Sequence, residues 1–283
     1  MKKYDVGFIG YGNMAQAIVA GLVSMDGKYI LKHSAGCKLR IAVSDLDEEK
    51  LMIAPKNVAA TKDTAGMVDA CDVIILAIKP QQAKEALAGL DFTGKIVVSI
   101  MASVTIDAIK SITGNATNKI VRVMPNLNAR IGCAFSTFTS SGLSADEKRL
   151  VSGILLTIGD FREINEDQMN SATGLCGSGP AFVFKFINAL IEDAVKNGIE
   201  KEIAVPMALG TVVGSANLVD ATFAEKGLDY SIDELVKSVC SKGGTTIQGV
   251  NFLNENNFDA IISGAVDKAV ARAEEMSKDN EKC

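Results

Sequence analysis

The sequence predicts an α/β protein, with a doubly wound, Rossmann-type domain over residues 1–164 and an all-helical domain over residues 165–283. Three observations predict this arrangement. Apolar, β-rich runs alternate with helical stretches in the first part, a glycine-rich turn follows the first run, and strand-like runs stop after about Glu163. Continuous apolar runs of this length are typical of parallel strands that helices cover on both faces.

The expected strands follow one another through the first domain. They are Asp5–Ile9, Leu39–Val43, Asp72–Ile78, Lys95–Ile100, Ile120–Val123 and Ala134–Thr139. A helix over Met14–Met25 is expected after the first strand, and the polar stretch Asp26–Lys38 lengthens the connection to the second. Alternation of strands and helices predicts crossover connections and hence a parallel, doubly wound sheet.

The second domain is expected to consist of long, Ala-rich helices joined by glycine-containing turns. These helices are Ser178–Asn197, Ile203–Glu225 and Phe258–Ser277. Pro206 fits the first turn of its helix, where a missing N–H costs least. Apolar residues cover more than one side of Ala181–Leu190 and Met207–Val219, which is more than one helix layer hides. We therefore expect burial against a second copy in a homodimer.

The composition excludes several classes of protein. The chain has 283 residues, of which 48% are hydrophobic and 22% charged, a balance typical of globular proteins. Its net charge of −5 offers no basic field for nucleic acid or an anionic membrane. We see no apolar run near the ~20 residues of a spanning helix and no signal-peptide pattern, so we expect a cytoplasmic protein without membrane contact. Six cysteines without a CxxC pair and a single histidine predict no metal site.

A glycine-rich turn lies between the first expected strand and the first helix. Gly10 permits the tight turn, Gly12 lets the backbone approach a pyrophosphate, and Ala15 allows close packing of helix on strand. Asn13 and Met14 open the helix, whose first amides would face the anion. The turn therefore predicts dinucleotide binding, with an ordinary strand–helix turn as the alternative.

An acidic residue follows the second expected strand. Asp45 would bind the ribose hydroxyls and repel a 2′-phosphate, which favours NADH over NADPH. It lies 35 residues after Gly10, whereas the usual spacing is ~20, so the connection must hold an insertion. Asp47, Glu48 and Glu49 follow, so a solvated acidic turn is the alternative. Ser44 is a second candidate for a ribose or phosphate oxygen.

The single histidine bears on the type of reaction. Many hydroxyacid dehydrogenases use a histidine to exchange the alcohol proton, but His33 lies in the polar insertion, far from the strand ends. Reduction of a C=N bond has less need of such a group, because a protonated imine is already an electrophile. The protein must then hold donor and acceptor together and anchor the substrate.

A polar, glycine-containing turn precedes a helix late in the chain and could anchor a carboxylate. Its hydroxyls and amides come from Ser241, Gly243, Gly244, Thr245 and Thr246. The alternative is a plain helix cap with Thr245 or Thr246 as the capping residue.

Five motifs, in order along nearly the whole chain, together resemble the pyrroline-5-carboxylate reductase family. They are GFIGYGNMAQAI at Gly7–Ile18, IKPQ at Ile78–Gln81, RVMPN at Arg122–Asn126, GSGPA at Gly177–Ala181 and SKGGTT at Ser241–Thr246. The family reduces 1-pyrroline-5-carboxylate to proline with NADH or NADPH. Its members are obligate dimers with intertwined helical domains, and the dimers often assemble into decamers.

The resemblance also implies roles for matching positions. It places the dinucleotide at Gly10, Gly12, Asn13, Met14, Ser44, Ala77, Ile78, Lys79 and Pro80, with Asn126 near the nicotinamide. It places the substrate carboxylate at Ser241, Gly244, Thr245 and Thr246, completing a site with the partner's nucleotide domain. Thr246, the donor nearest the imine nitrogen, is the expected catalytic residue.

Some positions depart from the family pattern. Leu127-Asn128-Ala129 stands where the family usually has Thr-Pro-Ala, and Lys242 replaces the proline of S-P-G-G-T-T. Asp45-Leu46 stands where an Asn-Arg pair often reads the NADP phosphate. The departures leave open a paralogue that binds dinucleotide without catalysis.

A second alternative is a β-hydroxyacid dehydrogenase or imine reductase relative. The dehydrogenases have a catalytic lysine four residues after the last glycine of a similar helix opening. Val183 stands there in this chain, and Lys185 is off register.

Overall fold

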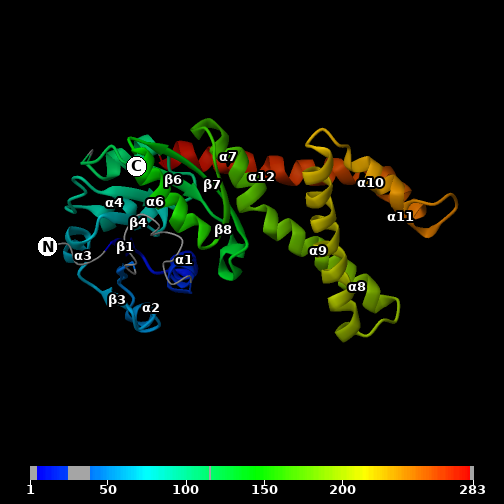
Figure 1. Cartoon of the computed structure of the whole chain (residues 1–283), viewed down its shortest axis with the longest axis horizontal. Coiled ribbons are helices and arrows are strands. Elements are labelled where there is room, and N and C mark those ends of the chain that lie inside the picture. The colour runs from blue at the N-terminus through cyan, green and yellow to red at the C-terminus, as the bar shows by residue number, and fades with distance from the viewer. Residues whose placement is uncertain (1–4, 25–38, 115, 281–283) are drawn as a thin grey trace. The chain divides into compact units, whose positions relative to one another are not determined.

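The computed structural model of the protein describes residues 5–24, 39–114 and 116–280. The described residues form two compact units, Met1–Pro180 with Asp267–Cys283, and Ala181–Val266 (Figure 1). Strands end at Glu163, close to the domain border expected at residue 164, but residues 165–180 and the end of the chain belong to the first unit. The border therefore stays a prediction. His33 and the insertion around it lie outside the described residues.

The first unit contains an eight-stranded sheet in the order β3-β2-β1-β4-β5-β6-β7-β8. The strands are β1 (Val6–Ile9), β2 (Ile41–Ser44), β3 (Val58–Thr61), β4 (Val73–Leu76), β5 (Ile96–Ser99), β6 (Ile120–Met124), β7 (Ala134–Ser141) and β8 (Gly159–Glu163). Every predicted strand is present, and the Rossmann-type fold is confirmed. β3 and β8 were not predicted. The sheet is also not wholly parallel, because β7 runs antiparallel to β6.

Alternation along the buried strands distributes side chains between two cores, one on each face of the sheet. Phe8 and Ile75 belong to the core that contains Ile18 of the first helix. Their neighbours Ile9 and Leu76 belong to the other core. Successive strand residues point to opposite faces, so burial on both sides requires an apolar residue at nearly every position. This is why the strands were visible in the sequence.

Helices and short helical turns connect the strands of the first unit. They are α1 (Asn13–Ser24), α2 (Glu48–Met52), α3 (Thr64–Ala70), α4 (Pro80–Leu87), α5 (Ile106–Ile112), η1 (Leu127–Ile131), α6 (Ala145–Leu156), η2 (Glu166–Gln168), α7 (Met169–Ala172) and η3 (Thr173–Gly177). η1 and η2 are 3₁₀ turns, and η3 is a π turn. α1 bears out the first predicted helix.

The second unit is helical throughout. Its elements are α8 (Gly179–Lys196), α9 (Lys201–Lys226), α10 (Ile232–Val239), α11 (Thr245–Glu255) and the first part of α12 (Phe258–Asn280). The predicted long helices correspond to α8, α9 and α12. The placement of Pro206 was wrong, because α9 begins at Lys201 and puts the proline inside the helix. The helix forgoes one hydrogen bond there, since proline has no N–H.

The last turns of α12 belong to the first unit. Asn280 donates a hydrogen bond to the carbonyl of Ser103 at 3.0 Å. Ser277 and Asn170 are joined by a hydrogen bond of 3.2 Å. The chain therefore leaves the first unit at α8 and returns to it at its end.

Two helical stretches are more apolar than the sequence argument allowed. Glu166–Lys196 and Lys201–Lys226 are long and apolar enough to cross a membrane by length and composition alone. Our argument counted uninterrupted apolar runs and so overlooked helices in which small and polar residues are interspersed. The most apolar windows of these stretches are only 6% and 11% buried. A large apolar helix surface in this chain therefore needs a cover.

Candidate functional site: the cofactor cavity and the anchor turn

The turn between β1 and α1 depends on its two glycines for different reasons. Gly10 has φ +90, and a Cβ there would lie 2.6 Å from the carbonyl oxygen of Ala77. The turn thus fits against the end of β4 only without a side chain. A Cβ on Gly12 would meet no described atom within 4 Å. Gly12 therefore keeps clear a space that the protein itself does not fill.

The first turn of α1 faces that space. The helix is 12 residues long, and Ala15, 1% exposed, packs in the core beneath it. Gln16 donates a side-chain hydrogen bond to the Tyr11 carbonyl at 2.9 Å and thereby braces the turn. Free amides at a helix start favour an anion. The turn therefore suits a phosphate group.

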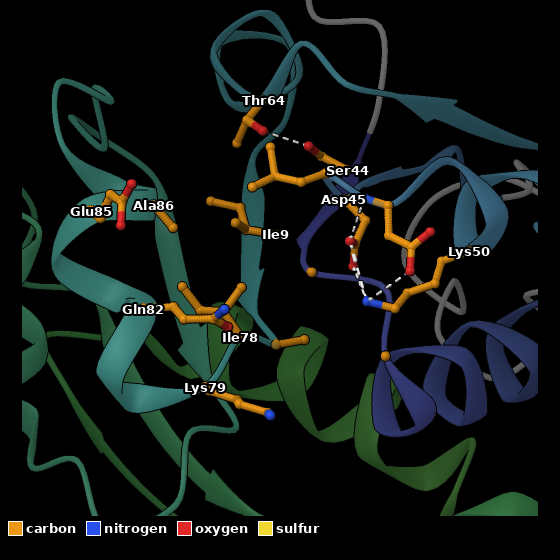
Figure 2. Close-up of a pocket in the computed structure, with 15 residues that line it drawn as sticks. Ile9, Ser44, Asp45, Lys50, Thr64, Ile78, Lys79, Gln82, Glu85 and Ala86 are labelled. Atoms are coloured by element: carbon orange, nitrogen blue, oxygen red, sulfur yellow. Dashed lines mark hydrogen bonds and ion pairs between the residues drawn. The ribbon is translucent and has the colours of Figure 1, made fainter.

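A cavity of about 660 Å³ opens beside the turn, at the carboxyl ends of β1, β2 and β4 (Figure 2). In the sheet order, β1 lies between β2 and β4, so the chain reverses direction of winding here. Doubly wound sheets bind ligands at this switch point. The lining residues are Ile9, Gly10, Gly12, Ser44, Asp45, Leu46, Asp47, Lys50, Thr64, Ala77, Ile78, Lys79, Gln82, Glu85 and Ala86.

The cavity brings together most, but not all, of the residues predicted to bind the dinucleotide. Gly10, Gly12, Ser44, Asp45 and the segment 77–79 line it. The other predicted residues do not, namely Asn13, Met14, Pro80 and Asn126. Asn13 and Met14 form the start of α1, and Pro80 is the first residue of α4.

Asp45 already has protein partners on both carboxylate oxygens. Oδ2 accepts a hydrogen bond from the Tyr11 amide at 2.8 Å, and Oδ1 accepts one from the Asp47 amide at 3.0 Å. The ammonium of Lys50 lies 3.4 Å from each oxygen (Figure 2). Burial alone would raise the pKa of the Asp45 carboxyl, but these three partners outweigh it and hold that pKa below its usual range. Asp45 is therefore ionised at neutral pH and tied to the phosphate turn.

Ser44, the last residue of β2, already has a hydrogen-bond partner in the protein. Ser44 is 2% exposed, and its hydroxyl lies 2.5 Å from the Thr64 hydroxyl at the start of α3 (Figure 2). One of these hydroxyls donates to the other. A ligand oxygen would have to share this pair rather than meet an unoccupied serine.

Asn126 follows β6 and joins that strand to the π turn. Its side-chain amide donates to the Cys176 carbonyl at 3.0 Å, and its side-chain oxygen accepts from the Asn128 amide at 3.2 Å. The family's usual proline at position 128 has no N–H to donate. In this chain, the departure to Asn128 therefore supplies a hydrogen bond that holds the Asn126 side chain in place.

The predicted anchor turn lies in the second unit. Gly244 is the N-cap residue of α11, and Thr245 and Thr246 are the first helical residues. The alternative in which either threonine caps the helix is therefore wrong. Gly243 has φ +74, and the Gly244 amide donates to the Ser241 carbonyl at 3.0 Å. Among the described residues, no partner is seen for the hydroxyls of Ser241, Thr245 and Thr246, which leaves them available to a ligand.

Comparison with known proteins identifies the chain. Residues 166–276 match the family model of pyrroline-5-carboxylate reductase dimerisation, and residues 5–103 match that of NADP oxidoreductase, coenzyme F420-dependent. A pyrroline-5-carboxylate reductase of Aquifex aeolicus is 36% identical over 96% of this chain and 97% of its own length. The chain belongs to the pyrroline-5-carboxylate reductase family.

Solved structures agree with this membership. A pyrroline carboxylate reductase of Plasmodium falciparum with NADP bound has a TM-score of 0.82 and 26% identity, over 98% of this chain and 99% of that one. The Streptococcus pyogenes 1-pyrroline-5-carboxylate reductase has a TM-score of 0.82 and 29% identity, over 96% and 98% of the two chains. The β-hydroxyacid dehydrogenase alternative is thereby set aside.

A nicotinamide dinucleotide is the cofactor of this family, and the described residues fit it. The side-chain-free approach at Gly12, the start of α1 and the adjoining cavity together provide a phosphate site and room for a nucleoside. The dimerisation match covers both of the long apolar helical stretches. These stretches thus lie in the part of the chain that matches the dimerisation model.

Sequence reasoning missed several residues of the cavity. Lys50 and Thr64 belong to segments around β3 that were not predicted, and Gln82, Glu85 and Ala86 form the α4 wall opposite Asp45 (Figure 2). Pro80 after a strand indicates where α4 begins, but it does not say which residues of α4 line the cavity. In the sequence, the acidic run 45–50 that ends at Lys50 cannot be distinguished from a solvated turn.

Proposed function

We propose that this protein reduces 1-pyrroline-5-carboxylate to L-proline, the last step of proline biosynthesis, with a reduced nicotinamide dinucleotide as hydride donor. The observation that carries the proposal is the phosphate turn opening on the switch-point cavity in a chain of this family. When bound, the cofactor supplies the hydride. The residues proposed to hold it are Gly10, Gly12, Asn13, Met14, Ser44, Asp45, Ala77, Ile78, Lys79, Pro80 and Asn126.

The anchor turn is proposed to hold the substrate carboxylate. Ser241, Gly243, Gly244, Thr245 and Thr246 offer hydroxyls and amides at the start of α11, and a helix start favours an anion. Thr246 is proposed to place its hydroxyl beside the imine nitrogen, where it donates to the nitrogen while that is unprotonated and accepts from the N–H once the imine is protonated. The substrate is already an electrophile when protonated, so the reaction depends mainly on positioning.

A homodimer is proposed as the functional form, with further assembly into a decamer as the family suggests. Large apolar side chains on α8 and α9 are about half exposed, which is unusual for side chains of this size. They include Phe184, Phe186, Met207, Val213 and Leu218. A second copy would remove this surface from water. The same cover accounts for the apolar helices without a membrane, in keeping with a cytoplasmic enzyme.

NADH is proposed as the preferred cofactor, because Asp45 is an ionised carboxylate at the end of β2. Purified protein supplied with racemic 1-pyrroline-5-carboxylate is expected to oxidise NADH faster than NADPH. The loss of near-ultraviolet absorbance of the reduced cofactor measures this oxidation. Faster use of NADPH would keep the reaction and remove the role given to Asp45. Cofactor binding without turnover of any cyclic imine acid would instead favour the non-catalytic paralogue.

A further inference from the structure

The cavity contains a lysine that none of the family motifs includes. Lys50 lies on α2, and its ammonium reaches back to the end of β2, where the ribose of a dinucleotide is expected (Figure 2). The other cavity lysine, Lys79, follows β4 and lies beyond Ile78, away from Asp45 in the same view. Lys50 is therefore the cation placed to meet a group on the ribose.

The hold of Asp45 on Lys50 is weak. The Nζ–oxygen distances are 3.4 Å to both Asp45 oxygens and 3.7 Å to Oδ2 of Asp47, whereas a strong charge-assisted hydrogen bond is ~2.7–2.9 Å long. The Lys50 side chain is 41% exposed, so its ammonium keeps contact with water. Its four-carbon stem can turn to another anion at small cost.

Asp45 does not need Lys50 to remain satisfied. The amides of Tyr11 and Asp47 donate to its two oxygens at 2.8 and 3.0 Å. Lys50 can therefore leave Asp45 without exposing an unpartnered carboxylate in the wall of the cavity. A fixed negative charge and a movable positive charge stand side by side at this point.

We infer that Lys50 is the residue that admits the 2′-phosphate of NADPH to a site whose fixed charge, Asp45, favours NADH. The ammonium would turn from Asp45 to the phosphate and separate the two negative groups. This inference rests on the proposed function of the cavity. It gives the chain a different solution from the Asn-Arg pair usual at positions 45 and 46.

The test compares two nucleotide fragments that differ only in the 2′-phosphate. Calorimetry measures the Kd of 2′,5′-ADP and of 5′-AMP for the wild-type protein and for Lys50→Met, which keeps the stem and removes the charge. We expect Lys50→Met to bind 2′,5′-ADP about 10- to 100-fold more weakly, the range for a lost hydrogen bond between charged groups. Its affinity for 5′-AMP should be unchanged. Lys50→Arg should retain the affinity for 2′,5′-ADP.

Lys62→Met is the matched control. Lys62 pairs with Glu48, which lies on α2 like Lys50, but Lys62 does not line the cavity. Removing its charge should therefore leave both affinities as in the wild type. Equal loss for both fragments in Lys50→Met, no loss for either, or the same loss in Lys62→Met would overturn the inference. If the wild-type protein binds neither fragment, the proposed cofactor site itself fails. If it binds both and Lys50→Met behaves like it, only the role of Lys50 fails.

Discussion

Alanine at position 10 is expected to lower the stability of the protein, whereas alanine at position 12 is expected to weaken cofactor binding. Gly10→Ala places a side chain at φ +90 and a Cβ 2.6 Å from the Ala77 carbonyl oxygen. A positive φ costs a non-glycine residue about 1–2 kcal/mol, and overpacking adds about 1–3 kcal/mol. We therefore expect Gly10→Ala to lose on the order of 2–5 kcal/mol, which lowers the Tm by roughly 3–8 °C for a chain of this size.

Gly12→Ala should behave differently, because its Cβ meets no described atom within 4 Å. The folded protein keeps its Tm or gains slightly, since alanine restricts the unfolded chain. The new Cβ instead occupies the approach to a pyrophosphate, and a misplacement of ~1 Å can lower kcat/KM on the order of 10²-fold.

Thermal unfolding at matched protein concentration and NADH titration by calorimetry measure the two effects separately. The apoprotein is used for the Tm, so that loss of cofactor does not affect it. The reasoning is refuted if Gly12→Ala unfolds as early as Gly10→Ala, or if it binds NADH like the wild type. Either result would mean that the two glycines do not have the separate roles that their surroundings indicate.

Four further predictions concern the carboxylate, the anchor and the assembly. Asp45→Ala should raise the KM for NADH and for NADPH together, because the Tyr11 amide loses its acceptor. With the folded pKa of Asp45 lowered, its stabilisation is present above the unfolded pKa and lost as pH falls through the folded one. The free energy of unfolding, measured as a function of pH, should thus be higher for the wild type than for Asp45→Asn at neutral pH. Below the folded pKa of Asp45 the two proteins should be equally stable. Thr246→Ala should raise the KM for the imine acid and leave the KM for NADH unchanged in steady-state kinetics. Val213→Asp, at a side chain 57% exposed on α9, should lower the mass in analytical ultracentrifugation towards the monomer.

The parts of the fold that were predictable are those in which burial determines composition. β1, β2, β4 and β5 are buried along their whole length, and so are apolar at nearly every position. β3 has one fully buried residue, and β8 has none. Both lie at the ends of the sheet, where one side is solvated and polar residues are tolerated. Their sequences therefore resemble loops.

The direction of β7 could have been predicted and was not. Residues 125–133 separate it from β6, and they form only η1 and its flanks. A parallel connection needs a crossover of about a dozen residues or more. So short a link requires an antiparallel neighbour. The apolar pattern of β7 contains no information on direction, which is why pattern alone failed.

The turn of the site was predictable because its requirements are local, whereas the walls of the cavity were not. Gly10 and Gly12 are set by backbone geometry within one turn. The α4 wall and Lys50 meet that turn only through the order of the strands, with β2 and β4 on either side of β1. Sequence separation gives no measure of this proximity.

The role proposed for Asp45 in the choice of cofactor is coupled to the shape of the phosphate turn, two properties that sequence reasoning treated separately. Its Oδ2 accepts the Tyr11 amide, which lies between the two glycines of the turn. A substitution that removes the carboxylate to admit a 2′-phosphate therefore also releases the turn that holds the pyrophosphate. Lys50 has no such second role, because its ammonium contacts only Asp45 and Asp47 among the described residues. We therefore expect a substitution on α2 to change the cofactor preference with less damage to the phosphate turn than a substitution at the end of β2.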